Sequence, residues 1–89
     1  MFTKIDDLNP VSIRPAGPGD EAAVERLAAL ETREAPAGDL LLAENGREVV
    51  AVLPIEGGPA LADPFQRTAE VVELLALRAH QLDTGRRAA

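Results

Sequence analysis

The strongest structural signal in the chain is the segment Leu40-Leu41-Leu42-Ala43-Glu44-Asn45-Gly46-Arg47-Glu48-Val49-Val50-Ala51-Val52-Leu53. Two apolar runs, residues 40–43 and 49–53, lie on either side of the pair Asn45-Gly46. Asn-Gly is typical of a type I′ hairpin turn, because both central residues of that turn need a positive φ. Neither run alternates between apolar and polar residues, so we expect both faces of the hairpin to be covered.

One strand and one helix are predicted before the hairpin. The alternation of apolar and polar residues over 11–14 indicates a short, half-buried strand. Pro18 suits the first position of a helix that we expect to end near Arg33. The apolar arc of this helix consists of Ala23, Val24, Leu27 and Leu30, and the charged Glu31 lies inside the arc.

A short strand and a long helix are predicted after the hairpin. The turn Gly57-Gly58 precedes residues 60–62, which we expect to pair weakly at an edge because Pro54 and Pro59 each lack an N–H donor. Thr68 is a suitable N-cap for a final helix that should end near Leu82, with Gly85 as its stop signal and residues 85–89 as a disordered tail.

The apolar arc of the final helix is wider than packing on one sheet requires. We therefore predict that this helix also contacts another molecule, most simply a second copy of the chain. The candidate interface residues are Val71, Leu74, Leu75, Leu77, Arg78 and Leu82. Because an unpaired buried charge is costly, we hypothesise that Arg78 pairs with Glu31, within one chain or across a dimer; the alternative is that both lie at a rim, in contact with water.

These elements predict an α+β domain over residues 11–84, preceded by a lead-in over residues 1–10. The expected order is β-α-β-β-β-α, a small and mostly antiparallel four-stranded sheet with two helices.

Composition narrows the classes of function. The chain has 89 residues, a formal net charge of −6, one histidine and no cysteine, tryptophan or tyrosine. The negative charge disfavours nucleic acid as a partner, and the missing cysteines exclude thiolate catalysis and disulfides. No apolar run reaches the roughly 20 residues that span a bilayer, and the acidic start does not resemble a signal peptide, so we expect a cytoplasmic protein.

Several segments of the sequence resemble the N-terminal half of the GNAT N-acetyltransferase superfamily. The phrase Val11-Ser12-Ile13-Arg14-Pro15-Ala16 is similar to the family's opening strand, and Pro18-Gly19-Asp20 with the helix that follows is similar to its first helix. Residues 42–51 are similar to its second and third strands, so the likeness covers about residues 11–62. It implies a truncated GNAT-like fold.

The family's cofactor loop is where the chain departs from this pattern. In the family, glycines at a helix N-terminus allow backbone N–H groups to approach the pyrophosphate of acetyl-CoA. Here the segment Asp63-Pro64-Phe65-Gln66-Arg67-Thr68-Ala69-Glu70 has no glycine and carries acidic residues, and the family's tyrosine acid is missing. We therefore expect no cofactor, no metal and no catalytic residue.

The same loop admits a weaker functional reading. Arg67 and Thr68 are candidates for a small anion site at the start of the last helix. The simpler interpretation is an ordinary strand-to-helix connection in which Phe65 is packed and Thr68 caps the helix.

Three other polar residues have a chemical and a structural interpretation. His80 needs an oriented partner to act as a base, and a solvent-facing position near a helix end is the simpler interpretation. Glu44 and Glu48 flank the hairpin turn, where charged side chains are normally solvated rather than metal-binding.

Two classes of function follow. The first is a non-catalytic interaction module that self-associates or docks on a larger protein. The alternative is an acetyltransferase or acyl-CoA-binding protein that completes its site by oligomerisation. Size and charge alone also fit a small acidic regulator such as an antitoxin.

Overall fold

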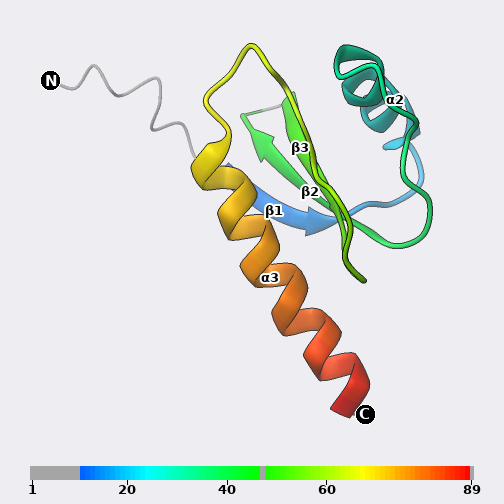
Figure 1. Cartoon of the computed structure of the whole chain (residues 1–89), viewed down its shortest axis with the longest axis vertical. Helices are drawn as coiled ribbons and strands as arrows, with labels where there is room; N and C mark the ends of the chain where they lie inside the picture. The colour runs from blue at the N-terminus through cyan, green and yellow to red at the C-terminus, as the bar shows by residue number, and fades with distance from the viewer. Residues whose placement is uncertain (1–10, 47, 89) are drawn as a thin grey trace, which may run out of the picture.

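The computed structural model describes residues 11–46 and 48–88, so the predicted lead-in over residues 1–10 lies outside the described part of the chain. The elements follow in the order β1 (Val11–Pro15), α2 (Glu21–Leu30), β2 (Leu40–Asn45), β3 (Glu48–Pro54), β4 (Leu61–Ala62) and α3 (Ala69–Ala88). The strands form one antiparallel sheet in the order β1-β2-β3-β4, which confirms the predicted α+β architecture (Figure 1).

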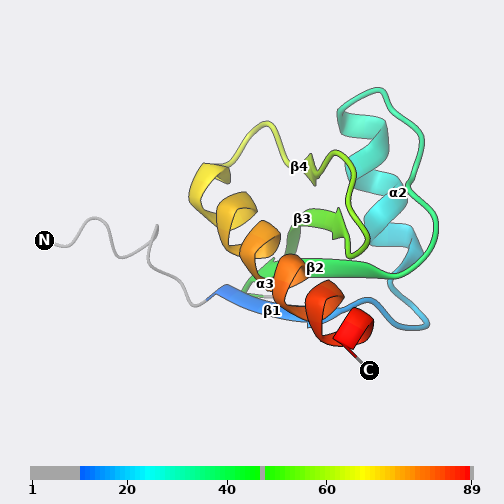
Figure 2. The same ribbon diagram turned by 60° about the horizontal axis from the view of Figure 1, so that its bottom comes forward.

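The sheet separates two apolar clusters, each covered by one helix (Figure 2). On one face, Leu27 of α2 packs with Leu42, Val52 and Leu61. On the other face, Leu75 and Ala79 of α3 pack among the remaining apolar residues of β2 and β3. The prediction that both faces of the hairpin are covered is therefore confirmed, because all residues of 40–43 and 49–53 are buried.

A β-bulge in β3 was not predicted. Ala43 pairs with Ala51 and Glu44 pairs with Val49, which leaves Val50 as an extra residue. Val50 and Ala51 both pack in the cluster beneath α3, whereas Val49 packs in the cluster beneath α2. The bulge thus explains how an uninterrupted apolar run serves both faces of the sheet.

The register shows which backbone groups of the edge strands point out of the sheet. Ala16 N–H donates to the Leu40 carbonyl at 2.9 Å, so the even-numbered residues of β1 bond to β2. The backbone groups of Val11, Ile13 and Pro15 therefore point away from the sheet. At the opposite edge, Asp63 N–H donates to the Val50 carbonyl, so the groups of residues 60 and 62 point outward.

The hairpin turn differs from the predicted one. Asn45 belongs to β2 and pairs with Glu48, so Asn45 is a residue of the ladder and not a central residue of the turn. Gly46 has a φ of 69°, as the first central residue of a hairpin turn requires. The β4 prediction is confirmed, because this edge strand has only two residues.

Both helices differ from their predicted bounds. Helix α2 begins at Glu21, after a turn containing Pro18, and ends at Leu30. Helix α3 begins directly after Thr68, as predicted, but it continues through Gly85 to Ala88 instead of ending near Leu82. The backbone of residues 85–88 is thus helical, because one glycine lowers helix propensity by only about 1 kcal/mol and does not force a stop. No helix in the described residues has the length and apolar character needed to cross a membrane.

Candidate functional site

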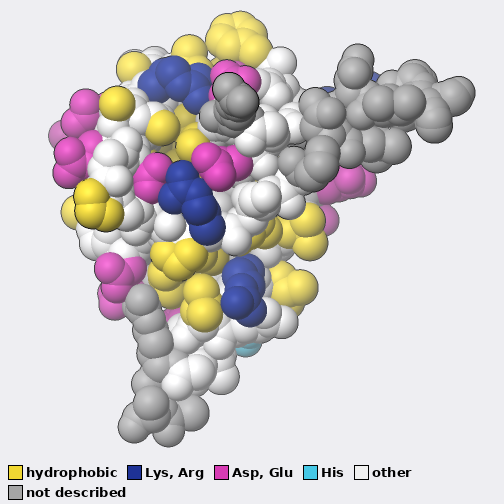
Figure 3. Space-filling view, turned by 180° about the vertical axis from the view of Figure 1, so that it is seen from behind, with side chains coloured by type: hydrophobic (Ala, Val, Ile, Leu, Met, Phe, Trp, Pro, Cys, Tyr) yellow, Lys and Arg dark blue, Asp and Glu magenta, His cyan; other side chains and the backbone are white. Residues whose placement is uncertain are grey.

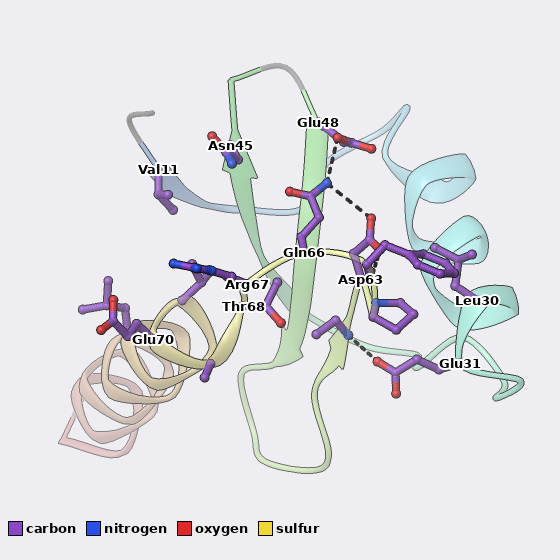
Figure 4. A pocket seen from close by; sticks show the side chains of 16 residues that line it. Val11, Leu30, Glu31, Asn45, Glu48, Asp63, Gln66, Arg67, Thr68 and Glu70 are labelled. Carbon is purple, nitrogen blue, oxygen red and sulfur yellow. Dashed lines mark hydrogen bonds between the residues drawn. The ribbon is translucent and has the colours of Figure 1, made fainter. Parts of the chain in front are cut away.

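A broad, open hollow of about 1760 Å³ surrounds the connection between β4 and α3 (Figure 4). On one side it is lined by Leu30 and Glu31, and on the other by Val11 and Glu70. Large hydrophobic side chains are unusually exposed here. Among the described residues, the exposed ones are Phe65 (82%), Leu77 (56%), Leu74 (51%), Val11 (37%) and Leu30 (37%), and all except Leu77 line the hollow.

Phe65 stands at the tip of a well-bonded turn. Asp63 is only 4% exposed, and its Oδ1 accepts the Phe65 N–H at 2.9 Å. Gln66 N–H donates to the Asp63 carbonyl at 3.2 Å. These bonds fix the backbone of the turn, and the Phe65 side chain at its tip lies in solvent. The interpretation in which Phe65 is packed is wrong, because this residue is 82% exposed.

Side chains from α2 and β3 secure this turn. Gln66 Nε2 donates to Glu48 Oε1 at 3.0 Å and approaches Asp63 Oδ2 at 3.4 Å (Figure 4). Arg26 Nη2 donates to the Val49 carbonyl at 2.6 Å, and its Nη1 lies 3.8 Å from carboxylate oxygens of both Glu48 and Asp63. Nothing in the sequence pattern indicates this role of Arg26.

The residues predicted as an anion site lie beside acidic groups. Arg67 is exposed and extends to the side of the hollow that carries Val11, while Thr68 is half-buried (Figure 4). The Thr68 carbonyl accepts the Val72 N–H at 2.8 Å, which begins the hydrogen-bonding pattern of α3. Glu70 also lines the hollow, and its negative charge opposes anion binding.

The predicted interface residues on α3 divide into two groups. Leu75 is completely buried, and Val71 and Leu82 pack against the same cluster within the chain. These three residues form part of the core. Leu74, Leu77 and Arg78 remain exposed, so the outward face of α3 is narrower than the apolar arc suggested.

Glu31 and Arg78 do not pair within the chain. Glu31 accepts the Ala62 N–H and lies 3.3 Å from Arg33 Nη1. Arg78 donates to Gln81 Oε1 at 3.4 Å on the exposed side of α3. Glu31 is therefore satisfied by strand β4 and by its neighbour Arg33.

Glu44 and Glu48 take part in separate ion pairs and do not form a carboxylate pair. Glu44 Oε1 lies 3.2 Å from Arg14 Nε, whereas Glu48 Oε2 lies 3.8 Å from Arg26 Nη1. His80 is exposed on α3. Within the described ranges, no cluster of three or more acidic, histidine or cysteine side chains is placed to hold a metal ion.

The surface on the back of the molecule is mixed in character (Figure 3). In the upper half of this view, basic side chains lie beside acidic ones, and hydrophobic side chains form small groups between them. A phosphate backbone is bound by a continuous basic surface, and this face does not present one.

One polar atom beside Val11 is notable. Asn45 Oδ1 is buried and receives no hydrogen bond from any residue in 11–46 or 48–88. Asn45 pairs with Val11 in the sheet and lines the same hollow.

Comparison with family models, curated proteins and solved structures finds no match to this chain.

Proposed function

We propose that this protein is a non-catalytic interaction module with a GNAT-like half-domain architecture, acting in the cytoplasm by associating with a second copy of itself. The observation that carries this proposal is the gathering of exposed Phe65, Leu74, Val11 and Leu30 around one hollow. Exposed apolar side chains scattered singly need no explanation, but a group around one concave surface is typical of a contact site.

The bonded turn that carries Phe65 supports the same function. Aromatic anchors dominate binding energy at many interfaces, and a backbone that is already ordered loses little conformational entropy on binding. The Phe65 N–H is bound by the buried carboxylate of Asp63, and the Gln66 N–H by the Asp63 carbonyl.

A second candidate function is an acyl-CoA-binding protein that completes its site by association. The position of the hollow, between β4 and the start of α3, favours it, because the GNAT resemblance would place the cofactor there. Glu31, Glu48, Asp63 and Glu70 all line the hollow and disfavour a pyrophosphate. We therefore prefer the non-catalytic function.

Light scattering on a sizing column tests the proposal with two matched variants. Leu74 and Leu77 are exposed to a similar extent on one helix, but only Leu74 lines the hollow. Leu74→Ser should weaken the dimer about tenfold or more, because each copy loses about 1 kcal/mol of apolar burial. Leu77→Ser should leave it nearly unchanged.

A monomer at all concentrations up to the millimolar range would contradict self-association. Calorimetric titration with acetyl-CoA separates the second candidate function. We expect no saturable heat, and micromolar binding would replace the non-catalytic function with the acyl-CoA-binding one.

A further inference from the structure

The two edges of the sheet are closed to different degrees. At the β4 edge, the outward Ala60 carbonyl accepts from Arg33 Nη1 at 2.8 Å, and the outward Ala62 N–H donates to Glu31. Glu31 and Arg33 also bind each other at 3.3 Å. This pair of side chains occupies the place that a neighbouring strand would take, so the β4 edge is protected against strand addition.

The β1 edge is less protected by the described residues, because Pro15 blocks one end of it but Val11 and Ile13 present their backbone groups. Its outward groups belong to Val11, Ile13 and Pro15. Within 11–46 and 48–88, one side chain reaches them: Arg14 Nη1 donates to the Pro15 carbonyl at 3.3 Å. The N–H and carbonyl of Ile13 bond to no residue of those ranges. A row of such groups is a template for another strand.

We propose that a second copy adds its own β1 to this edge, antiparallel and about a two-fold axis at Ile13, so that two four-stranded sheets join into one. The inference rests on the proposed self-association and specifies how it occurs. In this arrangement the two Ile13 residues exchange N–H···O=C bonds, and each Val11 N–H donates to the Pro15 carbonyl of the other copy. Pro15 has no N–H, so the Val11 carbonyl of the other copy gains no bond from it.

The side chains of β1 suit pairing with themselves. Ile13 packs on the α3 side of the sheet, and by alternation Val11 and Pro15 lie on that side as well. Ile13 would face the Ile13 of the other copy, and Val11 would face its Pro15, which covers the exposed Val11 and Pro15. Val11 also lines the hollow with Leu74, so the β1 edge continues the surface already proposed for association.

Charge on the other side of the sheet does not oppose the pairing. Across the axis, Arg14 of one copy faces Ser12 of the other. Each Arg14 is already bound by Asp20 at 2.8 Å and by Glu44 at 3.2 Å within its own chain. Two guanidinium groups therefore do not meet unpaired at the junction.

A proline substitution tests the proposed bonds. Ile13→Pro removes an N–H that points out of the sheet and leaves the bonds between β1 and β2 in place. Ile13→Ala is the matched control, because it removes the side chain but keeps the N–H. By light scattering, we expect the dissociation constant of the Ile13→Pro dimer to be at least tenfold higher than that of the Ile13→Ala dimer. The melting temperatures of the two variants should be similar.

Cross-linking gives a second measurement that does not depend on proline. The chain has no cysteine, so Ile13→Cys introduces a single thiol. Directly paired residues of this kind have Cα atoms about 5.5 Å apart, within the range that a disulfide bridges. Mild oxidation should give a covalent dimer of Ile13→Cys, and the control Leu77→Cys should remain uncross-linked.

The outcomes separate this inference from the proposed function. Strand addition is supported if the wild-type protein is a dimer, Ile13→Pro disrupts this dimer, and Ile13→Cys forms a disulfide across it. A dimer that Leu74→Ser weakens, but that tolerates Ile13→Pro and gives no Ile13→Cys disulfide, overturns strand addition and leaves the proposed function standing. A strictly monomeric wild-type protein overturns both.

Discussion

The guanidinium of Arg14 binds the carboxylate of Asp20 through two hydrogen bonds, of 2.9 and 2.8 Å. The same carboxylate accepts the Gly17 N–H at 2.7 Å. Asp20 directly precedes α2, and Arg14 lies in β1, so this pair attaches the start of the helix to the sheet. Glu44 of β2 binds the other side of the guanidinium, which extends the attachment to the next strand.

Asp20→Asn should destabilise the protein in a pH-dependent manner. The Arg14 side chain, together with the Gly17 N–H, holds the pKa of the Asp20 carboxyl well below its usual range. A group with a lowered folded-state pKa stabilises the fold above its unfolded pKa of about 3.9, and this stabilisation is lost as the pH falls further. Melting temperatures of wild type and Asp20→Asn should differ at pH 7 and converge toward pH 2. A difference that stays constant across this range would contradict the assigned role.

Asp63→Ala should loosen the turn that carries Phe65. The substitution leaves the Phe65 N–H without its acceptor and removes a buried partner of Arg26. Loss of such buried bonds costs about 1–3 kcal/mol, which urea unfolding can measure. Asp63→Asn is the control, because it retains an oxygen that accepts the Phe65 N–H. Equal losses in the two variants would show that charge, rather than this hydrogen bond, holds the turn.

Glu31→Ala should open the edge of β4. The Ala62 N–H then loses its carboxylate acceptor, so its hydrogen exchange should accelerate about tenfold, as expected for a charged hydrogen bond of 1.5 kcal/mol or so. Arg33→Ala is the control, since Arg33 binds the Ala60 carbonyl and not this N–H. An Ala62 amide that exchanges equally fast in wild type would argue against the Glu31 contact.

Two glycine substitutions should change the free energy of unfolding in opposite directions. Gly46 has a φ of 69°, a conformation that costs an alanine about 1–2 kcal/mol. Gly85 lies inside α3, and a Cβ there would meet no atom within 4 Å. Gly85→Ala should therefore stabilise the protein by about 0.5–1 kcal/mol, whereas Gly46→Ala destabilises it. Chemical denaturation of both variants checks the signs, and a neutral Gly85→Ala would indicate that the end of α3 is frayed.

The hairpin and its covered faces could be predicted because the pattern is local and long. The apolar runs on either side of Asn45-Gly46 are strong signals, and both faces of the resulting strands are indeed buried. The bulge at Val50 could not be predicted, because a run of consecutive apolar residues does not show which face each residue uses. The pairing of Asn45 with Glu48 could not be predicted for a similar reason, because the pattern locates a turn but does not set the register of its strands.

Most contacts that build the candidate site could not be predicted from the sequence. Arg26 and Val49 are far apart in the chain, and nothing in their spacing predicts their bond. Phe65 is different, because Asp63-Pro64 is a turn signal that could have placed the ring at an exposed tip. On α3, helical periodicity identified the apolar arc correctly, but only the structure distinguishes buried Leu75 from exposed Leu74.

The extra residue in β3 also determines where α2 is attached. Successive carbonyls of a regular strand point in opposite directions, yet here two successive carbonyls, those of Val49 and Val50, accept bonds from outside the β2–β3 ladder, from Arg26 and from the Asp63 N–H. A chain shortened by one residue at this point would form a regular ladder with one fewer carbonyl outside it. The guanidinium of Arg26 would then have no backbone carbonyl to bind. The length of this segment therefore determines whether Arg26 of α2 has a backbone acceptor on β3.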